Sequence, residues 1–286
     1  MLPGRNGRFS FELTESTMKY ATEELTNNRP SHGRVTLVGA GPGDPELLTV
    51  KAINAIKRAT VLLVDDLVNP EILAHASARS RIVQVGKRGG CISTPQSFIE
   101  KLMILAAKDG EEVVRLKGGD PFIFGRGGEE AAHLRAAGIH VEIVNGITSG
   151  LAASTALGVP LTHRDHAHGV VLVTGHNRPG ESATDWEALG SAVKTCHLTL
   201  VIYMGLAGIV DIQSGLLTVL PSSTPAAVIQ HASLPQQESV TCTLATLSQT
   251  IREHSLHSPA IILIGDVVAG VQAISNQLTL VTAITA

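Results

Sequence analysis

The segment "EVVRLKGGDPFIFGRGGEEAAHLRAA", residues 112–137, contains the pattern that decides the fold. Its first five residues form an apolar-rich run of strand length, while residues 129–137 are rich in helix formers and precede Gly138, a typical helix end. The loop between them holds five glycines, an Asp-Pro turn and two phenylalanines. A strand that leads through a loop into a helix is typical of parallel sheets, because parallel neighbours need a crossover connection.

The same order recurs on both sides of this segment. The N-terminal half therefore predicts a parallel sheet with helical crossovers. Its further strands are expected at 34–38, 61–64, 82–85 and 141–144, and its helices at 45–58, from about residue 70, and from 94 to 110. The C-terminal half predicts a second α/β unit, with strands near 170–174, 198–203, 226–230 and 259–264 and a candidate antiparallel strand within 239–247.

The chain has 286 residues, a length that favours two domains. "NGITSG", residues 145–150, is interpreted as a hinge between the two α/β halves. We predict a flexible N-terminal arm at 1–32, an N-terminal α/β domain at 33–145, a C-terminal α/β domain at 146–270 and a C-terminal tail at 271–286.

The composition limits the classes of function. A net charge of −3 provides no long-range field for nucleic acid, and no apolar run approaches the length of a membrane span. The three cysteines, Cys91, Cys196 and Cys242, lie far apart without a CxxC spacing, which suits a reducing compartment. We expect a cytoplasmic protein that binds neither nucleic acid nor membrane.

An unusual loop follows each strand of the N-terminal half. Because ligands bind outside the carboxyl ends of parallel strands, the five loops together predict one ligand site at that edge of the sheet. These loops are "GAGPGD" at 39–44, "DDLVNP" at 65–70, "GKRGG" at 86–90, "KGGDPFIFGRGG" at 117–128 and "NGITSG" at 145–150.

The first loop has alternative interpretations. Its glycines, Gly39, Gly41 and Gly43, favour a cofactor loop, but they do not have the G-x-G-x-x-G spacing of a dinucleotide fingerprint. Asp65 lies near the distance of a ribose-binding acid, so a nicotinamide or flavin enzyme stays open as an alternative. A tight strand-to-helix turn without a ligand is the structural alternative.

Charged residues in the other loops also allow two interpretations. Asp65 or Asp66 is a candidate general base or a simple turn residue. Lys87 and Arg88 can bind an acidic substrate or form a surface pair. "PLTHRDHAH", at 160–168, favours acid binding over metal, because no cysteine or regular histidine pair completes a ligand set. We expect no metal site.

Seven motifs occur in one order along residues 34–270, and together they resemble the tetrapyrrole (corrin/porphyrin) methylase family. They are "VGAGPGDPELLTVKA", "VGKRGG", "VVRLKGGDPFIFGRGGEE", "GITSG", "PLTHRD", "VTGH" and "YMG". The resemblance implies two α/β domains, each a mainly parallel or mixed sheet flanked by helices. It also implies S-adenosylmethionine in the interdomain cleft and a homodimer.

"VGKR" and "THRD" resemble the family members that methylate uroporphyrinogen III. The implied reaction adds methyl groups at C2 and C7, passes through precorrin-1 to precorrin-2, and releases S-adenosylhomocysteine. Precorrin-2 feeds siroheme, cobalamin or heme d1 synthesis. The alternatives are a sister methylase that acts on a later precorrin, and a tetrapyrrole carrier without catalysis.

The resemblance also implies roles for individual residues. Asp65 matches the proposed proton acceptor of the family and Lys87 its proposed proton donor. Asp66 stands where the family commonly has arginine, which leaves open which aspartate moves the proton. Arg126, Glu129 and Arg164 match residues implicated in substrate binding or catalysis. The implied cofactor contacts are Pro42, Gly118, Gly119, Asp120, Ile123, Thr148, Ser149, Met204 and Ala232, the last in place of a family glycine.

Overall fold

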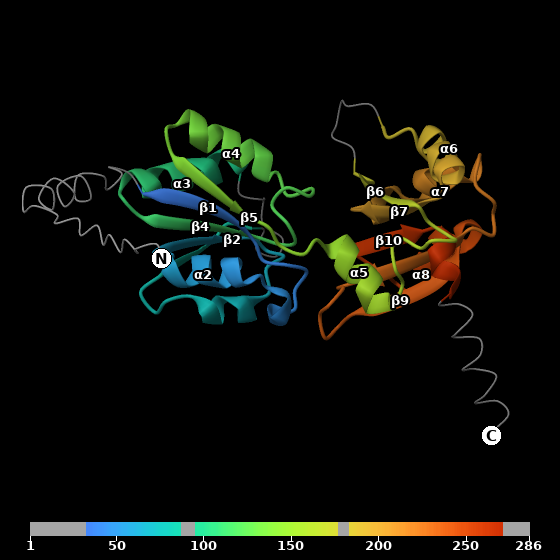
Figure 1. Ribbon diagram of the computed structural model, residues 1–286, viewed down its shortest axis with the longest axis horizontal. Coiled ribbons are helices and arrows are strands. Elements are labelled where there is room, and N and C mark those ends of the chain that lie inside the picture. Colours follow the sequence, from blue (N-terminus) through green and yellow to red (C-terminus); the bar gives the residue numbers. More distant parts are fainter. Residues whose placement is uncertain (1–32, 87–94, 177–182, 271–286) are drawn as a thin grey trace, which may run out of the picture.

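The computed structural model describes residues 33–86, 95–176 and 183–270, which form two α/β halves (Figure 1). The first half contains a five-stranded sheet in the order β3-β2-β4-β1-β5. Its strand pairs are all parallel, as the sequence predicted. The strands are β1 (Arg34–Gly39), β2 (Val61–Val64), β3 (Arg81–Gln84), β4 (Glu112–Lys117) and β5 (His140–Val144).

Helices cover both faces of this sheet (Figure 1). On one face, α2 (Val50–Arg58) and the 3₁₀ segment η2 (Pro70–His75) pack against the sheet. On the other face lie α3 (Gln96–Lys108) and α4 (Gly127–Ala136). Each helix layer covers every second side chain of the strands, because successive side chains of a strand point to opposite faces of the sheet.

The predicted continuous helix at 45–58 is wrong. Asp44 does cap a helical turn, but that turn is the short 3₁₀ segment η1 (Pro45–Leu47). A separate helix, α2, begins after Thr49, whose Oγ1 accepts a hydrogen bond from the Ala52 N–H at 3.1 Å. A second N-cap within the segment therefore ends the first turn and restarts the helix.

The second half contains a mixed sheet in the order β6-β7-β10-β8-β9. The first two strands are parallel and the remaining pairs are antiparallel, so the predicted antiparallel strand near 239–247 is confirmed as β9, which ends at Thr243. The strands are β6 (Gly169–Thr174), β7 (Leu198–Tyr203), β8 (Pro225–Gln230), β9 (Glu238–Thr243) and β10 (Ala260–Ile264).

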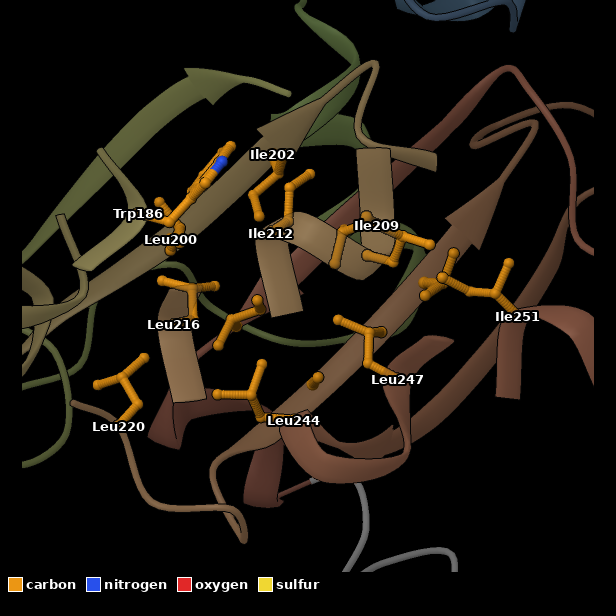
Figure 2. Packing of buried hydrophobic residues seen from close by; sticks show 14 of the residues in the cluster. Trp186, Leu200, Ile202, Ile209, Ile212, Leu216, Leu220, Leu244, Leu247 and Ile251 are labelled. Carbon is orange, nitrogen blue, oxygen red and sulfur yellow. The ribbon is translucent and has the colours of Figure 1, made fainter. Parts of the chain in front are cut away.

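Among the described residues, four α-helices and three 3₁₀ segments complete the second half. One face of the sheet packs on α6, α7 and α8 through a cluster that includes Trp186, Ile212 and Leu216 (Figure 2). The other face packs on α5. The helices are α5 (Ser149–Leu157), α6 (Trp186–Cys196), α7 (Ile209–Leu217) and α8 (Leu247–Glu253), and the 3₁₀ segments are η3 (Leu206–Gly208), η4 (Leu244–Thr246) and η5 (Asp266–Val268). No helix in the described ranges has the length and apolar character needed to cross a membrane.

Specific contacts join the two halves beyond the chain connection between β5 and α5. The Asp44 N–H donates to Ser233 Oγ at 3.2 Å, and the ring of Phe124 lies 4.7 Å from that of Tyr203. Ile123 packs on the apolar cluster of the second sheet. The predicted division at residues 145/146 falls between the last strand of the first sheet and α5, and it stays a prediction, while the arm at 1–32 and the tail at 271–286 lie outside the described residues.

Candidate functional site

Loops from the carboxyl ends of the first sheet meet at one edge. The loops after β1 and β4 form a short antiparallel bridge, in which the Gly119 N–H donates to Gly41 O at 2.7 Å and the Gly41 N–H donates to Gly119 O at 3.1 Å. Asn69, after β2, donates its side-chain N–H to Gly43 O at 2.9 Å. The loops after β1, β2 and β4 therefore meet as predicted, while residues 87–90 of the loop after β3 lie outside the described residues and the ligand site itself stays a prediction.

The bridge occupies the main-chain polar groups of Gly119, which the family resemblance implies as a cofactor contact. Its N–H and its carbonyl oxygen both bond to Gly41, and its contact with the cofactor stays a prediction. Gly119 has φ +67°, a conformation that L side chains rarely adopt. At Gly118, an added Cβ would come 2.9 Å from the Leu67 Cβ. These glycines therefore permit close packing of loops, and a ligand can approach the backbone where no side chain intervenes.

Asp120 links the loop after β4 to the loop after β5. Its Oδ1 accepts from the Phe122 N–H at 2.8 Å, and its Oδ2 accepts from the Asn145 side-chain N–H and the Gly146 N–H, both at 3.1 Å. The carboxylate is buried, and three donors hold it in place. Asp120 therefore fixes the geometry of the two loops on which the predicted cofactor contacts lie.

Asp65 follows β2 and forms ion pairs with two cations of β4. Its Oδ1 accepts from Arg115 Nη2 at 2.5 Å, and its Oδ2 lies 3.7 Å from Lys117 Nζ. The Asp65 side chain is 29% exposed, so its carboxylate is partly accessible to a ligand. Asp66 is exposed, and its carboxylate lies against Gly86, where an added Cβ would clash with it. The two aspartates therefore point to different surroundings.

Arg115, Lys117 and Glu130 form a buried charged group that the sequence prediction missed. Arg115 and Lys117 lie two residues apart on β4, so both side chains leave the same face of the sheet. That face is covered by α4, which contributes Glu130, and by α3, where the Gln96 side-chain N–H donates to Glu130 Oε1 at 2.7 Å. Charges at alternate positions of a central strand signal a buried partner, because an unpaired buried charge is costly.

Arg126 and Glu129 lie together at the start of α4. The Arg126 Nη2 donates to Glu129 Oε2 at 2.5 Å, and this hydrogen bond is the main cause that raises the pKa of the Arg126 guanidinium. Arg126 has φ +59° and its side chain is half exposed. Arg126 stands at the N-cap of α4 and Glu129 in its first turn, and their role in substrate binding or catalysis stays a prediction.

Arg164 lies in a separate tight turn of the second half. His163 and Ala167 exchange two backbone hydrogen bonds at 2.9 Å, and Arg164 is exposed between them. No hydrogen bond or ion pair among the described residues joins Arg164 to the charged residues of the first half. In the described part of the chain, His, Cys, Asp and Glu form no group of three or more that could hold a metal. Lys87 and Arg88 lie outside the described residues.

The predicted cofactor contacts of the second half lie around Tyr203. The Tyr203 hydroxyl pairs with Thr148 Oγ1 at 2.8 Å and accepts from the Gly150 N–H at 3.0 Å, so β7 fixes the start of α5. Burial raises the pKa of the Tyr203 phenol, which keeps it neutral. Met204 follows directly and is exposed, while Ala232 is buried beside Ser233, which contacts the loop after β1. Ser149 begins α5, and Pro42 lies within that first loop.

The residues present fit S-adenosylmethionine in chemical terms. The loops that meet here combine bare glycine backbone with exposed apolar side chains, namely Phe122, Phe124 and Met204. Such surfaces can receive an adenine ring, and the neighbouring hydroxyl and backbone groups can receive the polar ends of the molecule. The glycines and phenylalanines of the loop after β4 are visible in the sequence, whereas Tyr203 and Asn145 were not predicted as site residues because each acts through tertiary contacts.

Comparison with known proteins identifies relatives over most of the chain. A family model described as Tetrapyrrole (Corrin/Porphyrin) Methylases matches residues 34–248. A uroporphyrinogen-III C-methyltransferase of Pseudomonas aeruginosa is 53% identical over 236 residues, which are 82% of this chain and 94% of that protein. The corresponding enzyme of Pseudomonas fluorescens is 48% identical and covers 85% of this chain and 96% of its own.

Solved structures agree with this assignment. A uroporphyrin-III C-methyltransferase of Thermus thermophilus, complexed with S-adenosylhomocysteine, is 40% identical and matches with a TM-score of 0.70. The match covers 83% of this chain and 99% of that chain. From the motifs, the two-sheet fold and these relatives together, the chain belongs to the tetrapyrrole methylase family.

Proposed function

We propose that this protein transfers methyl groups from S-adenosylmethionine to C2 and C7 of uroporphyrinogen III and forms precorrin-2, for siroheme or cobalamin synthesis. The observation that carries this proposal is the meeting of the glycine-rich loops, Asp65 and Arg126 at one edge of the first sheet. Relatives of near full length that are named for this reaction support the same substrate. The residue roles below are part of the proposal.

The protein contributes chiefly by holding the reactants together. S-adenosylmethionine, when bound, supplies the methyl group as an electrophile on its sulfonium. Gly118, Gly119, Ile123, Thr148 and the other predicted contacts shape the surface that receives it. Positioning of two reactants and exclusion of water can contribute as much as ~7–11 kcal/mol to lowering a barrier.

Arg126 and Arg164 bind the carboxylates of the tetrapyrrole. The guanidinium of arginine binds a carboxylate through two parallel hydrogen bonds and stays charged at every working pH. Arg126 is exposed enough to reach a substrate, and Glu129 orients its guanidinium through the ion pair. Lys87 is the proposed proton donor.

Asp65 takes up the proton that the tetrapyrrole loses after methyl transfer. Its carboxylate is held by Arg115 and remains partly exposed, so it is both fixed and accessible. Asp66 faces Gly86 instead, which favours Asp65 of the two. A correctly placed general base contributes typically about 10²–10⁴-fold to the rate.

The protein is further proposed to act as a homodimer. Light scattering of the full chain then gives about twice the mass of one chain, which is 29.9 kDa. A mass that stays at one chain over the working concentration range contradicts the dimer and leaves the reaction untouched.

Mass spectrometry of the tetrapyrrole tests the reaction. The protein is incubated anaerobically with uroporphyrinogen III and S-adenosylmethionine, and a gain of two methyl groups with a transient singly methylated species is expected. Bound methyl donor without any gain points to a later precorrin as substrate, and binding of neither compound contradicts the proposal.

A further inference from the structure

Four charged groups lie together at the carboxyl ends of β2 and β4, and the reaction proposed above uses only Asp65. The other three are Arg115, Lys117 and Glu130, whose side chains are nearly or fully buried. Two cations and two carboxylates balance one another in charge. Because three of the four are shielded from water, their mutual interactions are stronger than those of surface pairs.

The guanidinium of Arg115 connects Glu130 to Asp65. Its Nε donates to Glu130 Oε1 at 3.3 Å and its Nη2 donates to Asp65 Oδ1 at 2.5 Å. Its Nη1 lies 3.4 Å from Leu63 O and 3.3 Å from Leu116 O. All three nitrogens therefore have partners, so the guanidinium has one orientation, and it imposes that orientation on the Asp65 carboxylate.

Glu130 is the counterion of both cations. It lies 3.2 Å from Lys117 Nζ through each of its oxygens and also accepts from Arg115. Burial, followed by the charge of Arg115, lowers the pKa of the Lys117 ammonium, while Glu130 and Asp65 oppose this change. Without Glu130, two cations would face Asp65 with no internal compensation.

In the described part of the chain, the backbone of Asp65 forms two further hydrogen bonds, both with main-chain groups. Its backbone N–H donates to Leu116 O at 3.1 Å, and its carbonyl accepts from the Val68 N–H at 3.2 Å. Asp66, on the same loop, turns its carboxylate toward Gly86. The charge balance at Asp65 is therefore set mainly by β4 and, through it, by α4.

We infer that Arg115, Lys117 and Glu130 are positioning residues, which together fix the Asp65 carboxylate at the carboxyl ends of β2 and β4. Arg115 and Lys117 contact this carboxylate directly, and Glu130 holds both cations in place. The link to turnover rests on the proposed function, whereas the charge network itself does not.

Two substitutions that change the charge around Asp65 in opposite directions test this inference. Glu130→Gln leaves two cations against Asp65 alone, so the acidic limb of the kcat/KM profile moves to lower pH. Arg115→Gln removes a cation, so the limb moves to higher pH. Each shift is expected to be about 0.5–1 pH unit, less than the ~1–3 units that an adjacent opposite charge can produce, because Asp65 is partly solvated. The double variant restores the charge balance and returns the limb toward the original pH.

A matched control is available on the same sheet. Lys51 and Glu142 form an ion pair of 2.6 Å between α2 and β5, and Glu142→Gln also neutralises a paired carboxylate. This control is expected to leave the acidic limb in place. Should Arg115→Gln fail to fold, Glu130→Gln against this control decides the question by itself.

A second measurement does not depend on the substrate. The carboxyl carbon resonance of Asp65, assigned with Asp65→Asn, is followed against pH by NMR in each variant. The inference is supported if the titration midpoints of the two single variants move in opposite directions. It is overturned if neither midpoint moves or if both move in the same direction. If the unaltered protein methylates no uroporphyrinogen III, the proposed function fails, while the NMR titration still tests the network.

Discussion

Asp120 acts through the two loops that it joins. Its buried carboxylate accepts three hydrogen bonds, and bonds to a charged group contribute about 1.5–3 kcal/mol each. We expect Asp120→Ala to lower the free energy of unfolding by about 2–4 kcal/mol. It should also raise the Kd for S-adenosylmethionine by about tenfold or more, a loss of at least ~1.4 kcal/mol.

Calorimetry of Asp120→Ala beside Asp65→Ala gives the comparison. Asp65 lies on the loop after β2 and makes its ionic contacts with β4, away from the bonds that join the loops after β4 and β5. Its variant should therefore bind S-adenosylmethionine nearly as the unaltered protein does. Equal dissociation constants for the two variants would show that Asp120 does not support the cofactor site.

Arg126→Ala is expected to lower turnover without weakening the binding of S-adenosylmethionine, unlike Asp120→Ala. Its side chain is half exposed and pairs only with a surface carboxylate in the described structure, so Arg126→Ala should change stability little. Loss of a charge-assisted contact with substrate lowers kcat/KM by about 10- to 100-fold, with an unchanged Kd for S-adenosylmethionine. Arg126→Lys, which keeps the charge but not the fork, should lie between the two in steady-state assays. Unchanged turnover in Arg126→Ala would place it outside the substrate site.

The sequence allowed exposed and loop residues of the site to be predicted more readily than buried ones. Asp120 and Arg126 stand out as charged residues beside glycines in a loop, whereas Asp65 has no glycine neighbour and its role was implied by the family resemblance. Arg115 and Glu130 are separated by fifteen positions, and only the packing of α4 on the sheet brings them together. Tyr203 reads as one more aromatic residue of a buried strand until its hydroxyl is seen to hold α5.

Gly146 lies where the loop after β5 passes close to the loops after β1 and β4. An added Cβ there would clash with Gly119 O and with the backbone of Gly39, and backbone atoms cannot move aside as a side-chain end can. We expect Gly146→Ala to separate the loops, to lower the thermal midpoint and to weaken binding of S-adenosylmethionine. Thermal unfolding and calorimetry measure both effects.

Gly128→Ala is the matched control for this change. It lies in the first turn of α4, and an added Cβ there meets no atom within 4 Å. Because alanine favours a helix over glycine by about 1 kcal/mol, this variant should be as stable as the original or slightly more stable. A Gly146→Ala protein that behaves like Gly128→Ala would show that the three loops tolerate wider spacing.

Strands were easier to predict than the ends and types of helices. Apolar runs such as residues 61–64 match observed strands because burial on both faces demands them. The segment 45–58 carries one helical pattern, yet the N-cap at Thr49 starts a new helix within it. The segment after Asn69 likewise forms a 3₁₀ turn where the sequence predicted a helix.

The site as a whole depends on contacts between two separately packed halves. The loop after β1 reaches Ser233, and an added Cβ at Gly43 would come 2.6 Å from the Leu234 side chain. The loop after β4 reaches the second half through Ile123 and Phe124. Sequence periodicity predicts each sheet, but it contains no signal for the angle or contacts at which the two meet.

A ligand held by both halves should stabilise the whole chain. S-adenosylhomocysteine at a hundred times its Kd adds about 2.7 kcal/mol to the folded state, provided that it binds the folded form only. For a chain of this size that corresponds to a rise of roughly 5–10 °C in Tm, measured by calorimetric scanning. In Asp120→Ala, the same ligand concentration should give a smaller rise, since that variant loosens the loops after β4 and β5 without touching the second sheet. A rise confined to one of two separate transitions would mean that the ligand is held by one half alone, and an equal rise in both proteins would mean that Asp120 does not support the bound ligand.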